Sequence, residues 1–165
     1  QRAAAKAWLV KVFFDTEFLE DGHTIALISI GVVREDGAEY YAETPCSHDL
    51  AASTEWLQAN VYPHLDHSAN GSIKSPFQIA TDLIAFAGEK PQWWAYFADY
   101  DWVVLCQLFG RMVDLPPYFP MYCMDLKQLS VSKGNPRHPK PAGVLHNALD
   151  DARWNRQLHE FLVAL

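Results

Sequence analysis

Two acidic residues follow a strongly apolar segment at an alternating spacing. Residues 9–14 read Leu-Val-Lys-Val-Phe-Phe, and Asp15 and Glu17 come directly after them. Because residues two apart in a strand lie on the same face, both carboxylates should project together from a strand that we expect to end in a turn over residues 15–18. Carboxylates this close repel each other unless a cation lies between them, and oxygen ligands favour Mg²⁺ or Mn²⁺. A solvated turn with two surface acids is the alternative, so a metal site requires further acids downstream.

A third acid, Asp101, lies on a helix predicted over residues 99–110. It shares a helical stripe with Val104 and Leu105, which places a carboxylate on the core-facing side of the helix, near the end of the preceding strand. Asp99, two residues earlier, is expected to cap this helix.

The last predicted helix, from about His146 to the C-terminus, carries a fourth acid. Asp151 lies seven residues before Leu158 and therefore on the apolar stripe, whereas Asp150 is turned about 100° away and can pair with Arg153. Because a buried charge without a partner is costly, we expect Asp151 to share a metal ion with the first two acids.

Four carboxylates and one histidine form the predicted catalytic set: Asp15, Glu17, Asp101, His146 and Asp151. The four acids can hold two metal ions about 3.5–4 Å apart, one activating a water molecule and one stabilising the leaving oxygen. His146 suits a general base, because imidazole accepts and releases protons near neutral pH. The predicted chemistry is phosphodiester hydrolysis with two Mg²⁺ ions, for which Mn²⁺ can substitute.

The elements that must position these residues predict an α/β fold, with a mixed five-stranded sheet flanked by helices. Strands are expected over 9–14, 24–33, 38–43, 93–97 and 121–124. Asp36-Gly37 signals a hairpin, so the first three strands should form an antiparallel meander, and the fourth should lie parallel to the first through a right-handed crossover. Helices are expected over 50–61, 76–87, 99–110, 125–131 and 146–165.

Length and composition favour a folded protein over a disordered or membrane-spanning chain. With 165 residues, half of them hydrophobic, the chain can form one well-packed domain, expected over residues 8–165, with residues 1–7 an N-terminal extension or a cloning remnant. No apolar run approaches the ~20 residues that span a bilayer. Three cysteines without a CxxC pair support neither a disulfide framework nor a zinc site, and a reducing cytoplasm fits best.

The net charge of −7 is unusual for a protein that binds nucleic acid, which ordinarily has a basic surface. Two divalent ions would reduce the charge to about −3. Residues 126–149 contain no acid but four cations, Lys127, Lys133, Arg137 and Lys140. This distribution favours an enzyme that holds an anionic substrate locally over a protein that coats long duplexes.

Three short motifs resemble those of the DEDDh 3′→5′ exonucleases, which have an RNase H-like fold. They are Asp15-Thr16-Glu17, Tyr100-Asp101-Trp102 and His146-Asn147-Ala148-Leu149-Asp150-Asp151-Ala152. Each is weakly specific alone, but all three occur in order and at appropriate intervals over residues 10–165. Wider relatives carry Asn a few residues before the second aspartate, whereas residues 97–100 read Phe-Ala-Asp-Tyr. Asp99 is therefore an alternative to Asp101, although the helical spacing favours Asp101.

Four longer stretches are similar to the small actinobacterial and phage polyadenylate-specific exoribonucleases, the RNase AS-like enzymes. They are Asp-Thr-Glu-Phe-Leu-Glu-Asp-Gly (15–22), Ser-Ile-Gly-Val-Val (29–33), Glu-Tyr-Tyr-Ala (39–42) and Tyr-Asp-Trp-Val-Val-Leu-Cys-Gln-Leu-Phe-Gly (100–110). The resemblance implies Mg²⁺ or Mn²⁺, single-stranded RNA trimmed from its 3′ end to nucleoside 5′-monophosphates, adenylate-rich 3′ ends and a homodimer.

Candidate substrate-binding residues are Thr16, Phe18, Trp102, Arg137 and Lys140. Phe18 could stack on the terminal base, since such stacking is worth ~1–3 kcal/mol per base, but a core position is equally compatible with its place after the strand. The basic residues of segment 132–143 could bind phosphates, with a solvated surface loop as the alternative.

Two further functions are compatible with parts of this pattern. A single-stranded DNA exonuclease or proofreading-type subunit would use the same chemistry. A non-catalytic module that binds nucleic acid is disfavoured, because a binding protein gains nothing from four clustered acids.

Overall fold

The computed structural model describes residues 9–68 and 71–165, and one mixed five-stranded sheet lies at its centre. The extension expected over residues 1–7 lies outside these ranges. The strands are β1 (Val10–Glu20), β2 (Ile25–Arg34), β3 (Glu39–Glu43), β4 (Pro91–Ala95) and β5 (Met124–Asp125). Their order is β3-β2-β1-β4-β5; the β1–β2 and β2–β3 pairs are antiparallel, and the β1–β4 and β4–β5 pairs are parallel. The predicted α/β class, the meander and the parallel strands are confirmed.

Helices connect the strands and cover both faces of the sheet. They are α1 (Ser47–Ala51), α2 (Glu55–Asn60), α3 (Pro76–Ala87), α4 (Asp99–Gln107), α5 (Leu126–Ser132) and α6 (Ala148–Val163), with short 3₁₀ helices η1 (Tyr62–His64) and η2 (Met112–Asp114). Local sequence sets several of these boundaries. Ser75 and Gln78 form a capping box at the start of α3, and Gly88 ends that helix at φ +72°. Asp125 caps α5 by accepting a hydrogen bond from the Gln128 N–H.

The predicted strand boundaries are wrong in three places. β1 has no turn over residues 15–18 and continues to Glu20, because it stays paired with β2 along this whole segment. β4 begins and ends two residues earlier than the predicted 93–97, and β5 lies at residues 124–125 rather than 121–124. These differences arise because pairing with a neighbouring strand, rather than local hydrophobicity, decides where a strand ends.

Two predicted helices also differ. The helix expected over residues 50–61 is two helices, because the Thr54 side chain caps a new helix by accepting a hydrogen bond from the Leu57 N–H. Asp99 does not cap α4: Ala98 occupies that position without a side-chain bond, Asp99 is the first helical residue, and the helix ends at Gln107.

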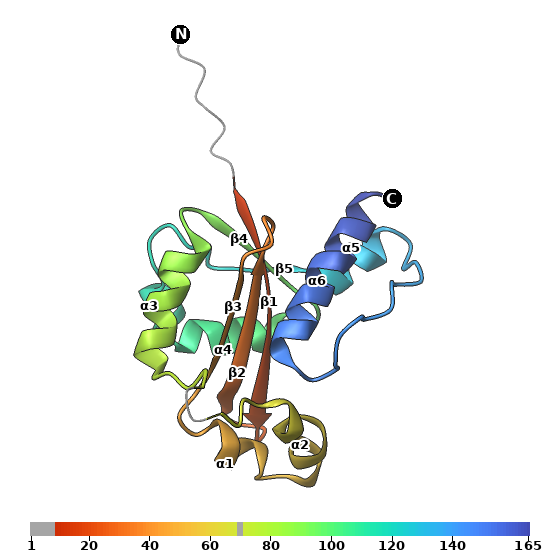
Figure 1. Cartoon of the computed structure of the whole chain (residues 1–165). Helices are drawn as coiled ribbons and strands as arrows, with labels where there is room; N and C mark the ends of the chain where they lie inside the picture. Colours follow the sequence, from red (N-terminus) through yellow and green to blue (C-terminus); the bar gives the residue numbers. More distant parts are fainter. Residues whose placement is uncertain (1–8, 69–70) are drawn as a thin grey trace.

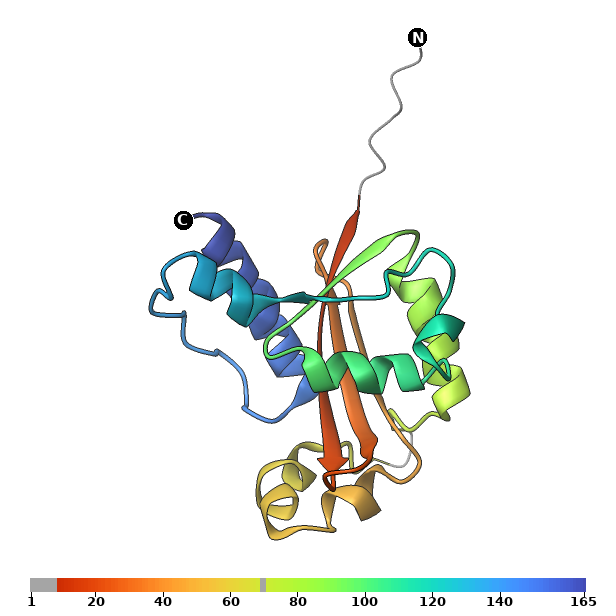
Figure 2. The same cartoon turned by 180° about the vertical axis from the view of Figure 1, so that it is seen from behind.

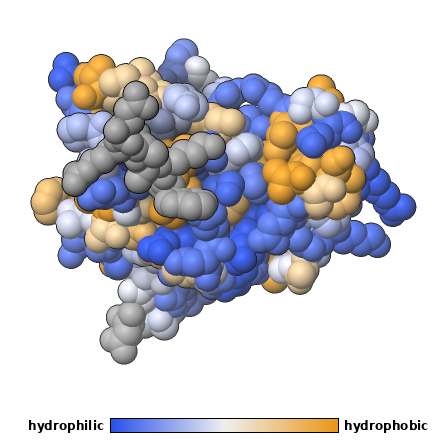
Figure 3. Space-filling model, turned by 90° about the horizontal axis from the view of Figure 1, so that it is seen from above, coloured by the Kyte–Doolittle hydropathy of each residue, from blue (hydrophilic) through white to orange (hydrophobic). Residues whose placement is uncertain are grey.

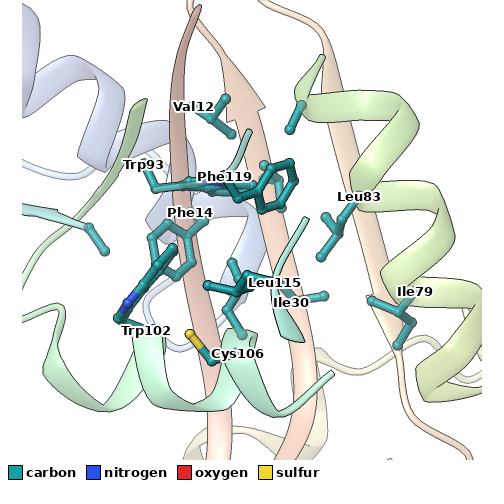
Figure 4. Packing of buried hydrophobic residues seen from close by; sticks show 14 of the residues in the cluster. Val12, Phe14, Ile30, Ile79, Leu83, Trp93, Trp102, Cys106, Leu115 and Phe119 are labelled. Atoms are coloured by element: carbon teal, nitrogen blue, oxygen red, sulfur yellow. The ribbon is translucent and has the colours of Figure 1, made fainter. Parts of the chain in front are cut away.

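β1 separates two hydrophobic cores, because its side chains alternate between the faces of the sheet. Val12 and Phe14 belong to a core under α3 and α4, where the Phe14 ring lies 5.5 Å from that of Trp93 and 6.3 Å from that of Trp102 (Figure 4). Phe13 points the other way, into a core formed with α5 and α6. Figures 1 and 2 show α3 and α4 on one side of the sheet and α5 and α6 on the other.

A third apolar cluster attaches α1 and α2 to the end of the hairpin between β1 and β2. Its buried members are Ile28, Ala51, Leu57, Val61 and Leu65. In both views α1 and α2 lie at the end of the sheet where β1 finishes (Figures 1 and 2). The segment between β3 and α3 therefore lies beside the acidic half of β1.

The opposite end of the molecule carries part of the exposed apolar surface. Seen from above, the hydrophobic colour gathers on the side of α5 and α6 (Figure 3). These helices and the C-terminus carry the exposed side chains Val131, Val163 and Leu165. No helix in the part of the chain that the structure describes has the length and apolarity needed to cross a membrane.

Candidate active site

β1 presents Asp15 and Glu17 on the face that α6 covers. Both residues continue the alternation that begins with Phe13, so they point toward the same side as that buried ring. A register shift follows directly, between Glu17 and Phe18, where the β1–β2 pairing is irregular. The acids therefore extend from a central strand that stays paired with β2, which fixes their backbone more firmly than the predicted turn would have done.

The N-terminal end of α6 brings Asp151 onto the same face. The backbone at the start of α6 packs directly on Gly31 of β2, the residue that pairs with Asp15. A Cβ built on Gly31 would lie 2.2 Å from the Ala148 carbonyl oxygen. Further along the helix, the buried Asn155 donates a hydrogen bond to the Phe14 carbonyl at 2.8 Å. These two contacts hold α6 against β1 and β2, so its acids approach those of β1.

The three carboxylates converge. Asp15, Glu17 and Asp151 each offer a carboxylate oxygen, and the three oxygens lie within 4.8 Å of one another. Burial, and then the charges of neighbouring acids, raise the pKa of Asp15 well above its usual range and the pKa of Glu17 to about 8. Burial also raises the pKa of Asp151, although a hydrogen bond from the His146 N–H at 2.9 Å opposes this. Burial and the neighbouring acids therefore destabilise the ionised form of these carboxylates.

Asp101 approaches from α4 and is tied to β1 through Thr16. β4 pairs with β1 only as far as Trp94, so the Thr16 N–H has no strand partner on that edge of β1. Asp101 accepts from this N–H at 2.9 Å and from the Thr16 hydroxyl at 2.6 Å through the same oxygen. Burial raises the pKa of Asp101 to about 6, against the lowering effect of the two bonds.

The position of Asp101 distinguishes it from Asp99. Asp101 is buried and lines the same cleft as the other three acids, although it is not one of the three whose oxygens lie within 4.8 Å. Its charge is nonetheless the second-largest cause, after burial, of the raised pKa of Asp15. Asp99 is exposed and does not line the cleft.

His146 lines the cleft from the loop that precedes α6. Its backbone is in the left-handed region, at φ +62°, which a residue other than glycine rarely adopts. The ring is packed edge-on against Trp56 of α2, with centroids 4.9 Å apart. The next residue, Asn147, caps α6 through its side chain and donates to the His64 carbonyl at 3.3 Å. The segment between β3 and α3 thus holds the histidine loop in place.

The acids form the floor of a cleft of about 420 Å³ whose walls are largely aromatic. The aromatic side chains at its surface are Phe18, Tyr96, Phe97, Tyr100 and Trp154. The sequence identified only the first of these, because the others come from the β4–α4 turn, α4 and α6, whose approach to β1 depends on tertiary packing. Trp56 and Gly31 were missed as well; a glycine inside a strand can indicate the close approach of another backbone.

The five residues considered for substrate binding lie in different surroundings. Phe18 lines the cleft and packs edge-on against Tyr100, with centroids 5.9 Å apart. Thr16 also lines it but is bonded to Asp101. Trp102 is instead buried in the core against Phe14 and does not line the cleft.

Arg137 and Lys140 are exposed on the loop between α5 and α6 and lie outside the cleft lining. The loop is anchored beside the aromatic wall. The His138 ring bonds to the Ser130 hydroxyl at 2.6 Å and lies edge-on to Tyr96, and the Trp154 ring N–H donates to the Pro139 carbonyl at 3.0 Å. The basic residues are thus carried at one side of the cleft.

The donor set suits divalent metal ions. All the candidate ligand atoms are carboxylate oxygens, the type that Mg²⁺ and Mn²⁺ prefer. Three of them lie close enough to share an ion, and a bound cation would stabilise their ionised forms against the burial and mutual repulsion that raise their pKa values.

Comparison with known proteins identifies the family. Residues 10–163 match the family model of the 3′–5′ exoribonuclease Rv2179c-like domain. The 3′–5′ exoribonucleases Rv2179c and MT2234.1, from two strains of Mycobacterium tuberculosis (H37Rv and CDC 1551), are each 44% identical over 148 residues, covering 87% of this chain and 88% of the relative.

Solved structures show the fold. S. pombe Pop2p in its Mg²⁺- and Mn²⁺-bound form aligns with a TM-score of 0.53 at 15% identity, over 93% of this chain and 81% of that one. A chain in the structure of the yeast NOT1 MIF4G domain co-crystallized with CAF1 aligns with a TM-score of 0.51 at 12% identity, over 93% of this chain and 80% of that one. Both support the RNase H-like fold expected from the three acidic motifs. The chain therefore belongs to the Rv2179c-like 3′–5′ exoribonuclease family.

Proposed function

We propose that this enzyme removes nucleoside 5′-monophosphates from the 3′ end of single-stranded RNA by a two-metal-ion mechanism, with a preference for adenylate-rich ends. The observation that carries the metal-dependent part is the convergence of the carboxylate oxygens of Asp15, Glu17 and Asp151 within 4.8 Å, with Glu17 buried and the other two residues partly buried. The RNA substrate follows from membership of an exoribonuclease family, and the adenylate preference from the resemblance to the RNase AS-like enzymes.

The proposed metal ligands are Asp15, Glu17, Asp101 and Asp151. When bound, two Mg²⁺ ions, or Mn²⁺ in their place, offset the charge of these acids and stabilise negative charge that develops on the phosphate oxygens. Thr16 positions Asp101 through its two hydrogen bonds, so that one Asp101 oxygen stays free for a further ligand. Asp151 stays oriented by the His146 N–H.

His146 is the proposed general base, taking the proton from the attacking water as the phosphodiester bond breaks. Its ring lines the cleft that contains the four acids, and Trp56 packs against it. Attack on the last phosphodiester bond breaks its link to the 3′ oxygen. The shortened strand then ends in a 3′ hydroxyl, and the released nucleotide carries the 5′-phosphate.

The remaining proposals concern how the RNA strand is bound and how the protein assembles. Phe18 stacks on the terminal base, and Arg137 and Lys140 attract the phosphates upstream of it, which compensates locally for the net charge of −7. Residues 8–165 act as one exonuclease domain, and the enzyme works as a homodimer in the cytoplasm. The homodimer rests on resemblance to the RNase AS-like enzymes.

Matched oligomers test the proposal. A 5′-labelled single-stranded RNA, its DNA counterpart and a blocked 3′-phosphate RNA are incubated with the enzyme in Mg²⁺ or in EDTA. We expect a ladder of products shortened from the 3′ end, formed faster with RNA than with DNA and only with the metal, and a nucleoside 5′-monophosphate as the small product. Faster loss of the DNA would assign the enzyme to single-stranded DNA, and degradation in EDTA would overturn the metal-dependent mechanism. Adenylate, uridylate and cytidylate homopolymers then test the base preference.

A further inference from the structure

Phe97 combines three features that its packing does not explain. It lines the cleft that contains the four acids, its side chain is 63% exposed, and its backbone lies in the left-handed region at φ +54°. It lies in the turn between β4 and α4, two residues after Ala95 and two before Asp99. A bulky residue at positive φ is an outlier in folded proteins, because its Cβ crowds the backbone.

The surrounding structure imposes this conformation on the turn. The next residue, Ala98, is buried, and its N–H donates to the Asp125 side chain at 2.8 Å. Asp125 is itself held in place as the cap of α5. The chain must therefore turn sharply after β4, and Gly or Asn would adopt the required φ with less strain than Phe.

The phenylalanine ring contributes little to the core. It touches Tyr96 edge-on, with centroids 4.6 Å apart, and most of its surface remains open to solvent. Tyr96 in turn packs on Trp154, with centroids 5.2 Å apart, so the ring of Phe97 stands on a rigid aromatic support. A strained backbone that presents an exposed aromatic ring beside a cluster of acids indicates a binding role rather than a structural one.

We propose that Phe97 is a stacking residue for a base of the RNA strand, and that the enzyme retains strain in the β4–α4 turn in order to present this ring. The inference rests on the proposed function, since it needs a single-stranded substrate in the cleft. Aromatic rings stack on any base, because every base has a π face. Phe97 therefore contributes to the grip on the strand, and base preference comes from other contacts.

Substitutions at this position separate a binding role from a structural one. Phe97→Asn and Phe97→Gly remove the ring and relieve the backbone, so we expect a KM for single-stranded RNA about tenfold higher or more, with a melting temperature equal to or above that of the parent. Phe97→Trp keeps a stacking surface and should keep KM near the parent value. Phe77→Asn is the matched control, because Phe77 is also exposed, at 79%, but lies on α3 outside the cleft lining; its KM should be unchanged.

Abasic substrates provide a second readout. A series of 5′-labelled RNA oligomers carries one abasic nucleotide at the last, the second-last or the third-last position. If Phe97 stacks on one of these bases, the difference in kcat/KM between the parent and Phe97→Asn disappears for one oligomer of the series and persists for the others. A KM for Phe97→Asn within twofold of the parent, a lowered melting temperature for that variant, or an equal difference across the whole series would overturn the inference. A parent enzyme that degrades no RNA would instead overturn the proposed function.

Discussion

Gly31 and Ala148 are in direct backbone contact: a Cβ on the glycine would lie 2.2 Å from the carbonyl oxygen of the alanine and 2.3 Å from the amide nitrogen of Leu149. Gly31 lies in β2 opposite Asp15, and Ala148 is the first residue of α6. The distance between sheet and helix at this point therefore decides whether the acid of α6 reaches those of β1.

Replacing this glycine should separate the two elements. In Gly31→Ala the new methyl group must displace backbone rather than a flexible side chain, so we expect a loss of stability of about 1–3 kcal/mol and a fall in kcat of about a hundredfold or more. Thermal unfolding and RNA hydrolysis measure the two effects. Gly22→Ala serves as the control, because nothing lies within 4 Å of its Cβ position and its cost comes from φ +84° alone; it should lose stability but keep its activity. Full activity in Gly31→Ala would contradict the expected displacement.

Asp151→Asn should strongly reduce the rate of hydrolysis and yet stabilise the metal-free protein. The substitution removes one charge from a cluster whose members raise one another's pKa, so the melting temperature in EDTA should rise while kcat falls at least about a hundredfold. Asp150→Asn is the neighbouring control, since Asp150 pairs with Arg153 at 2.6 Å on the outer side of α6. Equal activities of the two variants would rule out the proposed role of Asp151.

The stability of the metal-free enzyme should fall as the pH rises. Burial and the neighbouring acids raise the pKa of Glu17 from 4.5 to about 8, so the folded state binds a proton between these values that the unfolded state has released. Protonation of Glu17 therefore contributes fully to stability below about pH 4.5, and this contribution is lost as the pH rises through about 8. Melting curves in EDTA from pH 5 to 8.5 measure this slope, and Mg²⁺ should restore more stability at pH 8 than at pH 6. Glu17→Gln should flatten the dependence, and a slope unchanged by that substitution would contradict the assignment to Glu17.

Thr16 should act through Asp101. Thr16→Val removes the 2.6 Å hydroxyl bond to Asp101 and leaves the 2.9 Å backbone bond. Loss of the hydroxyl bond favours the protonated form of Asp101. We therefore expect kcat/KM to fall about tenfold at neutral pH and to recover in part at higher pH. Thr16→Ser keeps the hydroxyl group and should behave like the parent. Identical pH profiles for the valine and serine variants would show that the hydroxyl bond has no influence.

Trp56 should hold His146, the proposed general base, in place. Trp56→Ala leaves the His146 ring without its edge-on neighbour at 4.9 Å and leaves a strained loop less constrained, so we expect kcat to fall about tenfold while KM stays within twofold. Trp56→Phe should recover most of the rate because it restores an aromatic contact. A rise in KM with unchanged kcat would indicate instead that Trp56, which is 55% exposed, contacts the substrate.

Patterns that depend on local periodicity were readable from the sequence. The alternation in β1 placed Asp15 and Glu17 on one face, and the stripe along α6 turned Asp151 inward and Asp150 outward, as the structure has them. The hairpin at Asp36-Gly37 and the cap of α3 at Ser75 are also local signals, and both are present.

Features that depend on contacts between distant segments could not be read in the same way. The continuation of β1 to Glu20 requires β2, and the pairing of Thr16 with Asp101 requires β4 to leave β1 after Trp94. The aromatic wall of the cleft likewise assembles from separate elements, so single residues such as Phe97 carry no local signal of their role. Trp102 follows Asp101 in the motif, but helix geometry turns it into the core.

The alternation of β1 also limits which changes of length this enzyme can tolerate. Val12 and Phe14 face one core, and Phe13, Asp15 and Glu17 face the other side. One residue inserted or deleted between Phe14 and Asp15 would send the carboxylates into the aromatic core and place apolar side chains at the proposed metal site. Single-residue insertions and deletions in this strand should therefore be absent from any library of variants selected for activity.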